Sequence, residues 1–203
     1  MDEIALVKSA QQGDLDSFNR LVLFHQDSVY NLACRILSDS DLASDAAQAT
    51  FISAYRNLSQ FRGGSFKAWL MRMASNNCLD ELRRQKRHPH LSLEPLNQEG
   101  EEEVENPVWL KDDSPTPESA FEMKELEMGI QHCIDQLPPE FKIVVLLVDV
   151  EGLDYAEASL SIQKPLGTVK SRLARARTRM QDCLRGFREL LPAEFRLEKE
   201  ESL

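Results

Sequence analysis

The sequence predicts an all-α protein in which an acidic, flexible linker joins two small helical domains. Three observations support this fold class. Apolar residues recur at helical spacing through most of residues 18–87. Residues 96–128 hold 11 acidic and 2 basic side chains together with three prolines, a composition typical of a linker. Residues 164–188 form a basic segment that carries its own apolar stripe.

Composition and charge exclude several protein classes. The chain has 203 residues, 24 basic and 34 acidic side chains, and a formal net charge of −10. Its longest strongly apolar stretch, residues 143–148, suits a buried core segment and is far too short to span a membrane. The first residues carry acids and lack the basic-then-apolar pattern of a signal peptide. We therefore expect a cytoplasmic protein without membrane insertion.

The cysteines show no pattern of a metal site. They form no CxxC pair, and no histidine lies at zinc-ligand spacing. We expect no metal and no cofactor. We also expect the cysteines to be small core residues rather than disulfide partners: Cys34, Cys78, Cys133 and Cys183.

The first domain is predicted to contain three helices. They are expected over about residues 18–37, 42–58 and 66–87, where apolar side chains recur every three or four positions. Asp39-Ser40-Asp41 interrupts the first period and can cap the second helix. The third helix is predicted to have an apolar stripe of Leu70, Ala74, Cys78 and Leu82, and an opposite polar stripe of Arg72, Asn76, Asp80, Arg83 and Arg87.

A glycine-containing loop separates the second and third helices. Residues 60–65 read QFRGGS, and Gly63-Gly64 breaks any helix there. Residues 62–90 hold 7 basic and 2 acidic side chains, beside aromatic residues at the start of the patch. Single-stranded nucleic acid is bound by such a combination of cations for phosphates and rings for unpaired bases. The alternative is that Phe66 and Trp69 are simply core residues.

The basic segment near the C-terminus predicts a helix that lies against a polyanion. Residues 164–188 contain eight Lys or Arg and one Asp, although the whole chain is acidic. Pro165 precedes this helix and Thr168 can act as its N-cap. The inward stripe is Val169, Leu173, Ala176, Met180 and Leu184, and the outward side carries Lys170, Ser171, Arg172, Ala174 and Arg175.

A second short helix is predicted just before the basic one. Residues 154–162 form this helix, and residues 163–166 can turn the chain. Two short helices joined by a tight turn, the second of them basic, are typical of a helix-turn-helix that enters the DNA major groove. The alternative is a solvated surface helix.

Several blocks, in this order and at these separations, resemble the sigma-70 family of bacterial RNA polymerase initiation factors, in particular its small extracytoplasmic-function (ECF) type. The blocks are ASDAAQATF at 43–51 with Tyr55, FRGG at 61–64, Trp69-Leu70, Asn76, Asp80, Arg83-Arg84, Leu137-Pro138, Tyr155 and PLGTVKSRL at 165–173. The resemblance covers nearly all of the chain except the linker and the two ends.

The resemblance implies partners and site residues. The core polymerase would be bound through the β′ clamp helices and the β flap, with Asp45, Gln48, Phe51 and Tyr55 on the clamp helices. The promoter −10 element, including a flipped base, would be held by Phe61, Arg62, Gly63, Ser65, Trp69, Arg72, Asn76, Asp80, Arg83, Arg84 and Arg87. The −35 element would be read by Thr168, Lys170, Ser171, Arg172, Ala174, Arg175 and Arg177. An anti-sigma factor is a further possible partner in this family.

The chain departs from the family pattern at a few positions. The docking helix usually carries acids where this chain has Ser44 and Ala49. A glycine is usual at Gln163, so we expect either a strained backbone there or a slightly reshaped turn. Ala174 stands where a larger side chain is common, which leaves the −35 preference open.

The domains then follow. We place the sigma-2-like domain at 1–90, the acidic linker at 91–120, the sigma-4-like helix-turn-helix domain at 121–190 and a tail at 191–203. The alternative function is a free-standing helix-turn-helix regulator. Such a regulator would have no use for the N-terminal motifs. An enzyme is not expected, because the sequence has no nucleotide loop, no carboxylate pair beside a histidine and no nucleophile motif.

Overall fold

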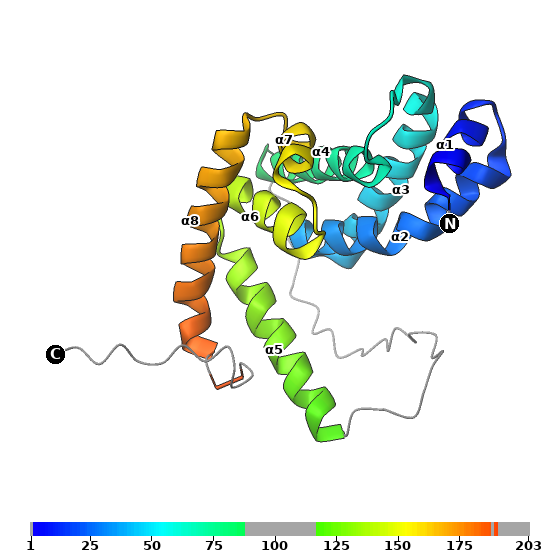
Figure 1. Ribbon diagram of the computed structural model, residues 1–203. Helices are drawn as coiled ribbons and strands as arrows, with labels where there is room; N and C mark the ends of the chain where they lie inside the picture. The colour runs from blue at the N-terminus through cyan, green and yellow to red at the C-terminus, as the bar shows by residue number, and fades with distance from the viewer. Residues whose placement is uncertain (1, 88–116, 188, 191–203) are drawn as a thin grey trace.

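The computed structural model describes residues 2–87, 117–187 and 189–190, and every regular element in these ranges is helical (Figure 1). The N-terminal group contains α1 (Glu3–Gln11), α2 (Leu15–Leu37), α3 (Ser40–Asn57), the short 3-10 helix η1 (Leu58–Gln60) and α4 (Phe66–Arg87). The C-terminal group contains α5 (Pro117–Asp135), α6 (Pro139–Val145), the π-helical turn η2 (Leu146–Val150), α7 (Tyr155–Ile162), α8 (Leu166–Leu184) and the 3-10 helix η3 (Arg185–Phe187). The predicted all-α fold with two helical groups is confirmed.

Two parts of the predicted organisation lie outside the described residues. They are residues 91–116 of the expected linker and the expected tail at 191–203. Within the described ranges, none of the helices combines the length and apolar character needed to cross a membrane.

Aspartate side chains begin several of the helices. The Oδ1 of Asp39 accepts a hydrogen bond from the Leu42 amide at 2.9 Å, as the predicted N-cap of α3 requires. Asp154 and Glu157 form a capping box at the start of α7. The predicted cap of the basic helix is wrong. Its first turn closes on the Pro165 carbonyl, which accepts from the Thr168 amide at 2.8 Å, so Thr168 lies inside α8.

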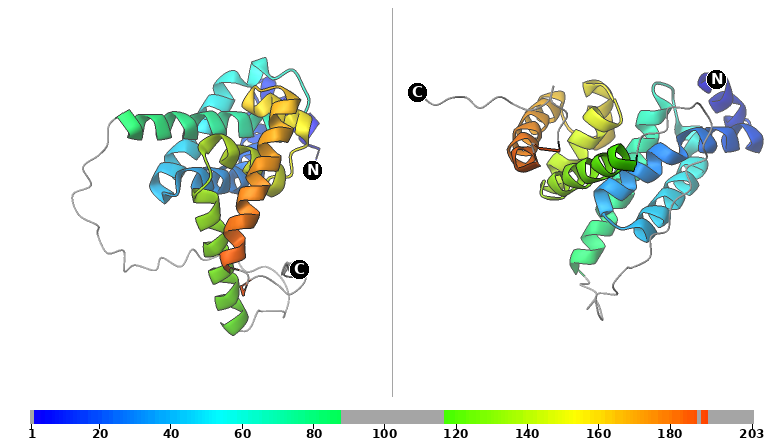
Figure 2. Two further views of the ribbon diagram at one scale, coloured as in Figure 1. Left: turned by 90° about the vertical axis from the view of Figure 1, so that its left-hand side faces the viewer. Right: turned by 90° about the horizontal axis from the view of Figure 1, so that it is seen from below.

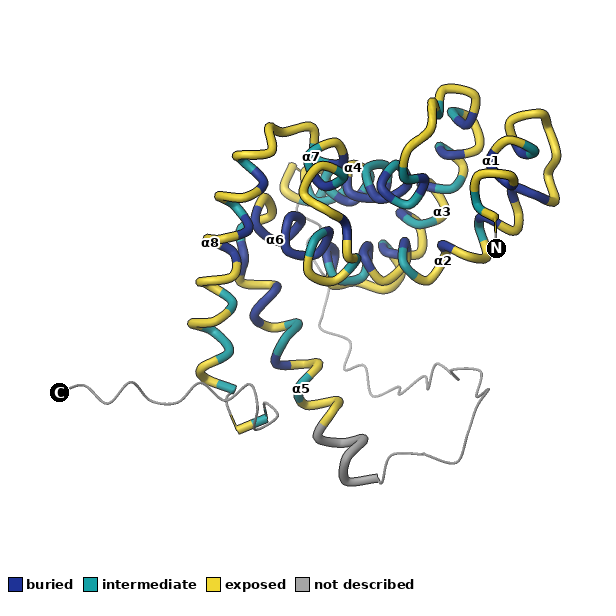
Figure 3. The backbone as a smooth tube through the Cα atoms, viewed as in Figure 1, coloured by how far each residue is buried: buried dark blue, intermediate teal, exposed yellow. Residues whose placement is uncertain are grey.

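The N-terminal group is built around α2, against which α1, α3 and α4 pack (Figures 1 and 2). Figure 3 shows the buried side of these helices facing one another. Phe24 also fits the apolar period of α2 but is 61% exposed. The buried positions of α2 repeat at helical spacing, as predicted: Phe18, Leu21, Val29, Leu32, Ala33, Ile36 and Leu37.

The C-terminal group packs α6 and α7 against α8, whose predicted inward residues Val169, Leu173 and Ala176 are buried. The apolar stretch at 143–147 is buried as well and passes from α6 into the π-helical turn η2. Helices α5 and α8 lie side by side and project from the rest of the molecule (Figures 1 and 2).

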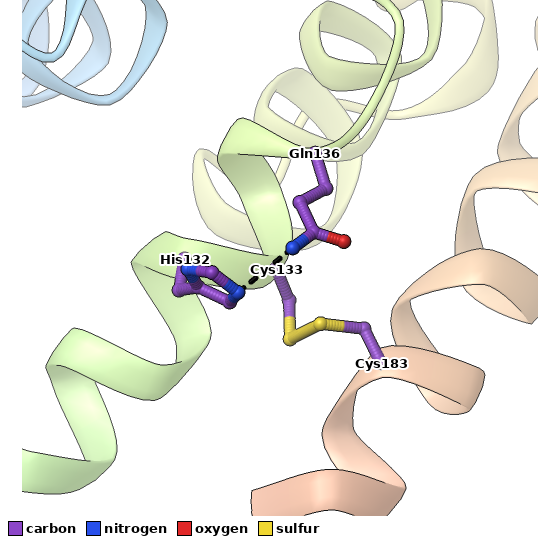
Figure 4. The surroundings of a disulfide bond; sticks show 4 residues. All are labelled: His132, Cys133, Gln136 and Cys183. Atoms are coloured by element: carbon purple, nitrogen blue, oxygen red, sulfur yellow. Dashed lines mark hydrogen bonds between the residues drawn. A yellow bond between two sulfur atoms is a disulfide. The ribbon is translucent and has the colours of Figure 1, made fainter.

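A disulfide joins α5 to α8, which corrects the prediction that all four cysteines are core thiols (Figure 4). Cys133 and Cys183 are bonded, with their Cα atoms 5.7 Å apart and 50 positions between them in the sequence. The spacing of the cysteines carried no sign of this bond, because only the pairing of the two helices brings the sulfur atoms together. Cys34 and Cys78 are free thiols, and burial raises the pKa of Cys78 to about 12.

The two groups contact each other directly between α4 and α7. The buried hydroxyl of Ser161 donates to the Ala68 carbonyl at 3.0 Å. The ammonium of Lys67 lies 3.0 Å from the carboxylate of Glu151, whose side chain is only 7% exposed. The predicted picture of two domains on a tether therefore lacked this packed interface.

Candidate nucleic-acid interface

A glycine loop, residues 61–65, connects η1 to α4 as predicted. Gly63 and Gly64 have φ values of 99° and 90°, a backbone region that favours glycine. The loop ends at Ser65, whose hydroxyl accepts a hydrogen bond from the Ala68 amide at 3.1 Å and so starts α4.

Aromatic rings line the loop. The Phe61 ring centroid lies 5.5 Å from that of Phe66 and 5.3 Å from that of Trp69. Phe66 is 2% exposed, so the core interpretation holds for this ring. Phe61 and Trp69 are half-buried and form part of the wall of a hollow of about 560 Å³. We call this space the aromatic hollow; its other lining residues include Asn57, Gln60, Arg62, Arg72, Asn76 and Asn77.

Helix α7 closes one side of the aromatic hollow through Glu157, Leu160 and Ser161. Leu160 is 72% exposed although it is a large apolar residue. The arrangement brings the C-terminal group next to the aromatic hollow.

The polar stripe of α4 continues away from the hollow. Arg72 is half-buried, and its Nε is buried without a hydrogen-bond partner among the described residues. A buried donor of this kind is normally satisfied by an external acceptor or water. Arg83 pairs with Asp80 at 2.6 Å, and the Nε of Arg87 donates to the Arg83 carbonyl at 3.3 Å. Asn76 and Arg84 are exposed, and Arg84 pairs with Glu81.

Some cations of α8 are exposed, and others form ion pairs with acids of the same group. The exposed residues predicted to face outward are Lys170, Ser171, Ala174 and Arg175. Arg172 is turned toward α6 instead, and its Nη2 lies 2.9 Å from the Glu140 carboxylate. The Nε of Arg177 donates to Asp149 at 3.0 Å, and this hydrogen-bonded ion pair raises the pKa of Arg177.

Of the two outcomes expected for the turn before α8, a strained backbone or a reshaped turn, the structure has the strained backbone. Gln163 ends α7 with φ 52° and ψ 45°, the left-handed conformation that glycine adopts at lower cost. The Lys170 ammonium lies 5.8 Å from the ring centroid of Tyr155, so α7 also helps to orient the first turn of α8.

Helix α3 exposes a mixed polar and apolar face. Asp45 and Gln48 are exposed, Phe51 is half-buried, and Tyr55 is 47% exposed with its ring 5.0 Å from that of Phe18. The four residues predicted to bind core polymerase therefore share this helix, with their polar members in solvent.

Comparison with known proteins decides the family. Sigma-70 region 2 matches residues 21–88, and Sigma-70, region 4 matches residues 127–180. The chain belongs to the sigma-70 family. The region 2 match contains α3, the glycine loop and α4, and the region 4 match contains α7 and most of α8.

Relatives in the sigma-70 family identify the ECF type. The chain is 38% identical to the RNA polymerase sigma-H factor of Pseudomonas aeruginosa, covering 88% of this chain and 92% of the relative. It is 37% identical to the ECF RNA polymerase sigma-E factor of Haemophilus influenzae, over 88% and 93%. Identity to the ECF RNA polymerase sigma factor SigE of Mycolicibacterium smegmatis is 34% over 87% of this chain, which spans 65% of that longer relative. The chain is an ECF-type RNA polymerase sigma factor, and the alternative of a free-standing regulator is wrong.

Solved structures share the fold. The structure of CnrH in complex with the cytosolic domain of CnrY has a TM-score of 0.64 at 20% identity, over 91% of this chain and 97% of that one. The sigma factor RpoE in complex with the anti-sigma factor NepR from Bartonella quintana has a TM-score of 0.61 at 22% identity, over 82% and 96%.

Sequence reasoning missed part of the interface. It assigned no role at the aromatic hollow to Glu157 or Leu160, which lie far along the chain from the glycine loop. Within the described residues, no three His, Cys, Asp or Glu side chains lie close enough to hold a metal ion.

Proposed function

We propose that this sigma factor binds core RNA polymerase through α3 and opens promoters by capturing a base in the aromatic hollow. The observation that supports the proposal most strongly is the hollow itself, with half-buried rings, amide side chains and a left-handed glycine loop at one end of a cationic helix. Unstacking a base costs a few kcal/mol, and a fitted pocket offsets that cost.

The −10 strand would follow α4 away from the hollow. Phe61 and Trp69 offer rings on which a base can stack. The half-buried Arg72 and the exposed amide of Asn76 line the hollow and offer N–H donors to acceptor atoms of the strand. Arg84 and Arg87, farther along α4, supply charge for phosphates.

The −35 element would meet the exposed face of α8. Lys170, Ser171, Ala174 and Arg175 face solvent and suit the major groove. Thr168 lies in the first turn and is half-buried. Arg172 and Arg177 already pair with acids of their own domain, so we assign them to phosphates that replace those carboxylates rather than to bases.

We assign the α3 face to the β′ clamp helices of core polymerase and the C-terminal group to the β flap. Asp45 and Gln48 supply exposed polar contacts, and Tyr55 supplies apolar area at the same face. We place the protein in the cytoplasm, where RNA polymerase works, and assign it no catalytic activity of its own. Because two structural neighbours are solved with the partners CnrY and NepR, the latter an anti-sigma factor, we also propose an anti-sigma partner for this chain.

Run-off transcription with purified core polymerase and a library of promoter fragments tests the function. We expect transcripts from a defined promoter class only when the protein is added. The protein alone should bind duplex promoter weakly and with little specificity. Nanomolar sequence-specific binding by the protein alone would contradict the proposal.

Separate variants test the two surfaces. Arg175→Ala should weaken −35-dependent initiation by about 1–3 kcal/mol if it contacts a base, while core binding stays normal. Arg185→Ala, at the end of the same helical segment, is the control. Asp45→Arg with Gln48→Ala should reduce core association without changing circular dichroism. The same loss of core binding in both cases would refute the assignment of roles.

A further inference from the structure

The last residue of α1 contacts the chain at both ends of η1. The Gln11 Nε2 atom donates to the Leu58 carbonyl and to the Phe61 carbonyl, each at 2.9 Å. A primary amide has two N–H donors, so one side chain satisfies both acceptors. We propose that Gln11 is a positioning residue that holds the glycine loop in the shape needed for base capture, an inference that rests on the function proposed above.

Gly63 and Gly64, in the middle of the glycine loop, have no side chains that could pack and hold the loop. A Cβ atom added at Gly63 or Gly64 would meet no heavy atom within 4 Å. Residues 61–64 line the aromatic hollow and also a second hollow of about 360 Å³, whose remaining wall is α1 with Phe66. Since open space adjoins the loop at both hollows, hydrogen bonds at its ends are needed to fix its position.

Helix α1 is a firm support for the Gln11 amide. Its Leu6, Val7 and Ala10 side chains are buried against the N-terminal group. Near its other end, the Glu3 carboxylate lies 2.7 Å from the Nε2 of His25, which is 3% exposed. These contacts tie α1 to α2 along its length, so the Gln11 side chain starts from a fixed place.

Aromatic contacts also connect α2 to the C-terminal end of the glycine loop. The His25 ring centroid lies 5.7 Å from that of Phe66, the first residue of α4. Phe66 in turn lies 5.5 Å from Phe61 in an edge-to-face arrangement. The loop is therefore held by Gln11 at its beginning and by the His25–Phe66 contact at its end.

Loss of the two Gln11 hydrogen bonds should release the loop into several conformations. Only one of them lines the aromatic hollow, so part of the binding free energy is then spent on ordering the loop. Because the hydrogen bond to Phe61 is exposed and the one to Leu58 only partly buried, each neutral bond is weak, and we expect base capture to weaken about tenfold rather than to disappear.

Three variants separate hydrogen bonding from shape. Gln11→Ala removes both donors. Gln11→Glu keeps the shape but presents oxygens that accept and cannot donate to the two carbonyls. Gln12→Ala is the matched control, since Gln12 is the exposed neighbour of the same type and its side chain makes no hydrogen bond within the described residues.

The assay uses holoenzyme assembled with core polymerase on a forked −10 template. An abasic scan of the exposed strand first locates the captured base as the position whose removal weakens wild-type binding most. A 2-aminopurine beside that position reports unstacking by fluorescence. We expect both Gln11 variants to bind the intact template about tenfold more weakly, with a smaller fluorescence change, and to match wild type on the abasic template and in core affinity. Gln12→Ala should behave as wild type throughout.

Every other outcome refutes either base capture or the positioning role of Gln11. If no abasic position weakens wild-type binding, base capture is wrong and the positioning role falls with it. If the scan finds such a position but both Gln11 variants bind the intact template normally, the positioning role alone is wrong. If the variants lose core affinity or bind intact and abasic templates equally poorly, Gln11 serves general folding, which also refutes the inference; the thermal midpoint of each variant identifies this case.

Discussion

Reduction of the Cys133–Cys183 disulfide should loosen the end of α8 without unfolding the N-terminal group. The bond joins positions 50 residues apart, and Figure 4 shows it bridging α5 and α8. A closed loop of this length corresponds to about 4 kcal/mol of lost chain entropy in the unfolded state at 25 °C. This figure is the upper bound of the expected effect, because measured disulfide contributions are often smaller.

The structure shows that the loss of stability on reduction should fall at the C-terminal end of α8. Toward its C-terminal end, α8 buries little side-chain surface, since Met180 and Leu184 are only half-buried. Beyond the disulfide, the Phe187 ring lies 5.7 Å from that of His132 and packs over Gly129. With so little apolar area, residues 177–187 depend on the disulfide more than the first turns of α8 do.

Hydrogen exchange of the full chain measures this effect peptide by peptide, which avoids treating a two-group protein as a two-state folder. Reduction, or Cys183→Ser, should speed exchange at the end of α8 and in the facing turns of α5 by up to about a thousandfold. Exchange in α2 and α3 should stay unchanged. Cys34→Ser, which removes a free thiol, is the control and should leave the redox dependence intact.

Equal exchange in the oxidised and reduced forms would refute this reasoning. It would mean that helix packing alone holds α8 against α5. Faster exchange spread evenly over the whole chain would also contradict it, because the bond would then support the fold globally.

Three further predictions follow from single residues. Gln163→Gly should stabilise the C-terminal group by up to about 1 kcal/mol in chemical denaturation, because glycine relieves the left-handed strain at φ 52°; a loss of stability would show that the Gln163 side chain contributes more than its backbone costs. Burial disfavours the charge of Asp135, but hydrogen bonds from Lys142 and Ser38 outweigh burial and lower its pKa below the usual 3.8. The stabilisation from Asp135 is therefore complete above that pH and lost as pH falls through the lowered pKa, and a pH titration of unfolding should show a smaller loss in Asp135→Asn than in wild type. Cys78, with a pKa of about 12, should resist alkylation at pH 8 in the native protein and react only after unfolding, as mass spectrometry of the labelled peptides would show.

Local patterns determined most of the helices in advance. The apolar periods place the ends of α3 and α4 within about two residues of those observed, and the start of α2 within about three, because burial of one face favours a helix at that spacing. Asp39 marks the start of α3, since its carboxylate satisfies a free amide. Gly63-Gly64 marks the loop for a similar local reason, the left-handed backbone.

The basic helix α8 shows which features helical spacing predicts and which it does not. Its inward stripe and its exposed Lys170 and Arg175 follow from helical spacing alone. Its spacing also placed Arg172 outward, yet that side chain is drawn to Glu140, 32 positions away. The pairing of Arg177 with Asp149 depends on a similar approach of separate elements.

The sequence by itself determined α2, α3, α4, α7 and α8, the two-group organisation and the family, because each rests on periodicity or on motifs that lie within a short stretch of chain; it did not predict α1, α5 or α6. Tertiary structure decided the Cys133–Cys183 bond, the α4–α7 interface and the contact of Gln11 with the glycine loop. These contacts join positions separated by about 50 residues or more, and each depends on where whole helices pack. The spacing of residues along the chain does not predict which distant positions come into contact. These contacts are set by the packing of all the helices, which is driven by burial of their apolar surfaces.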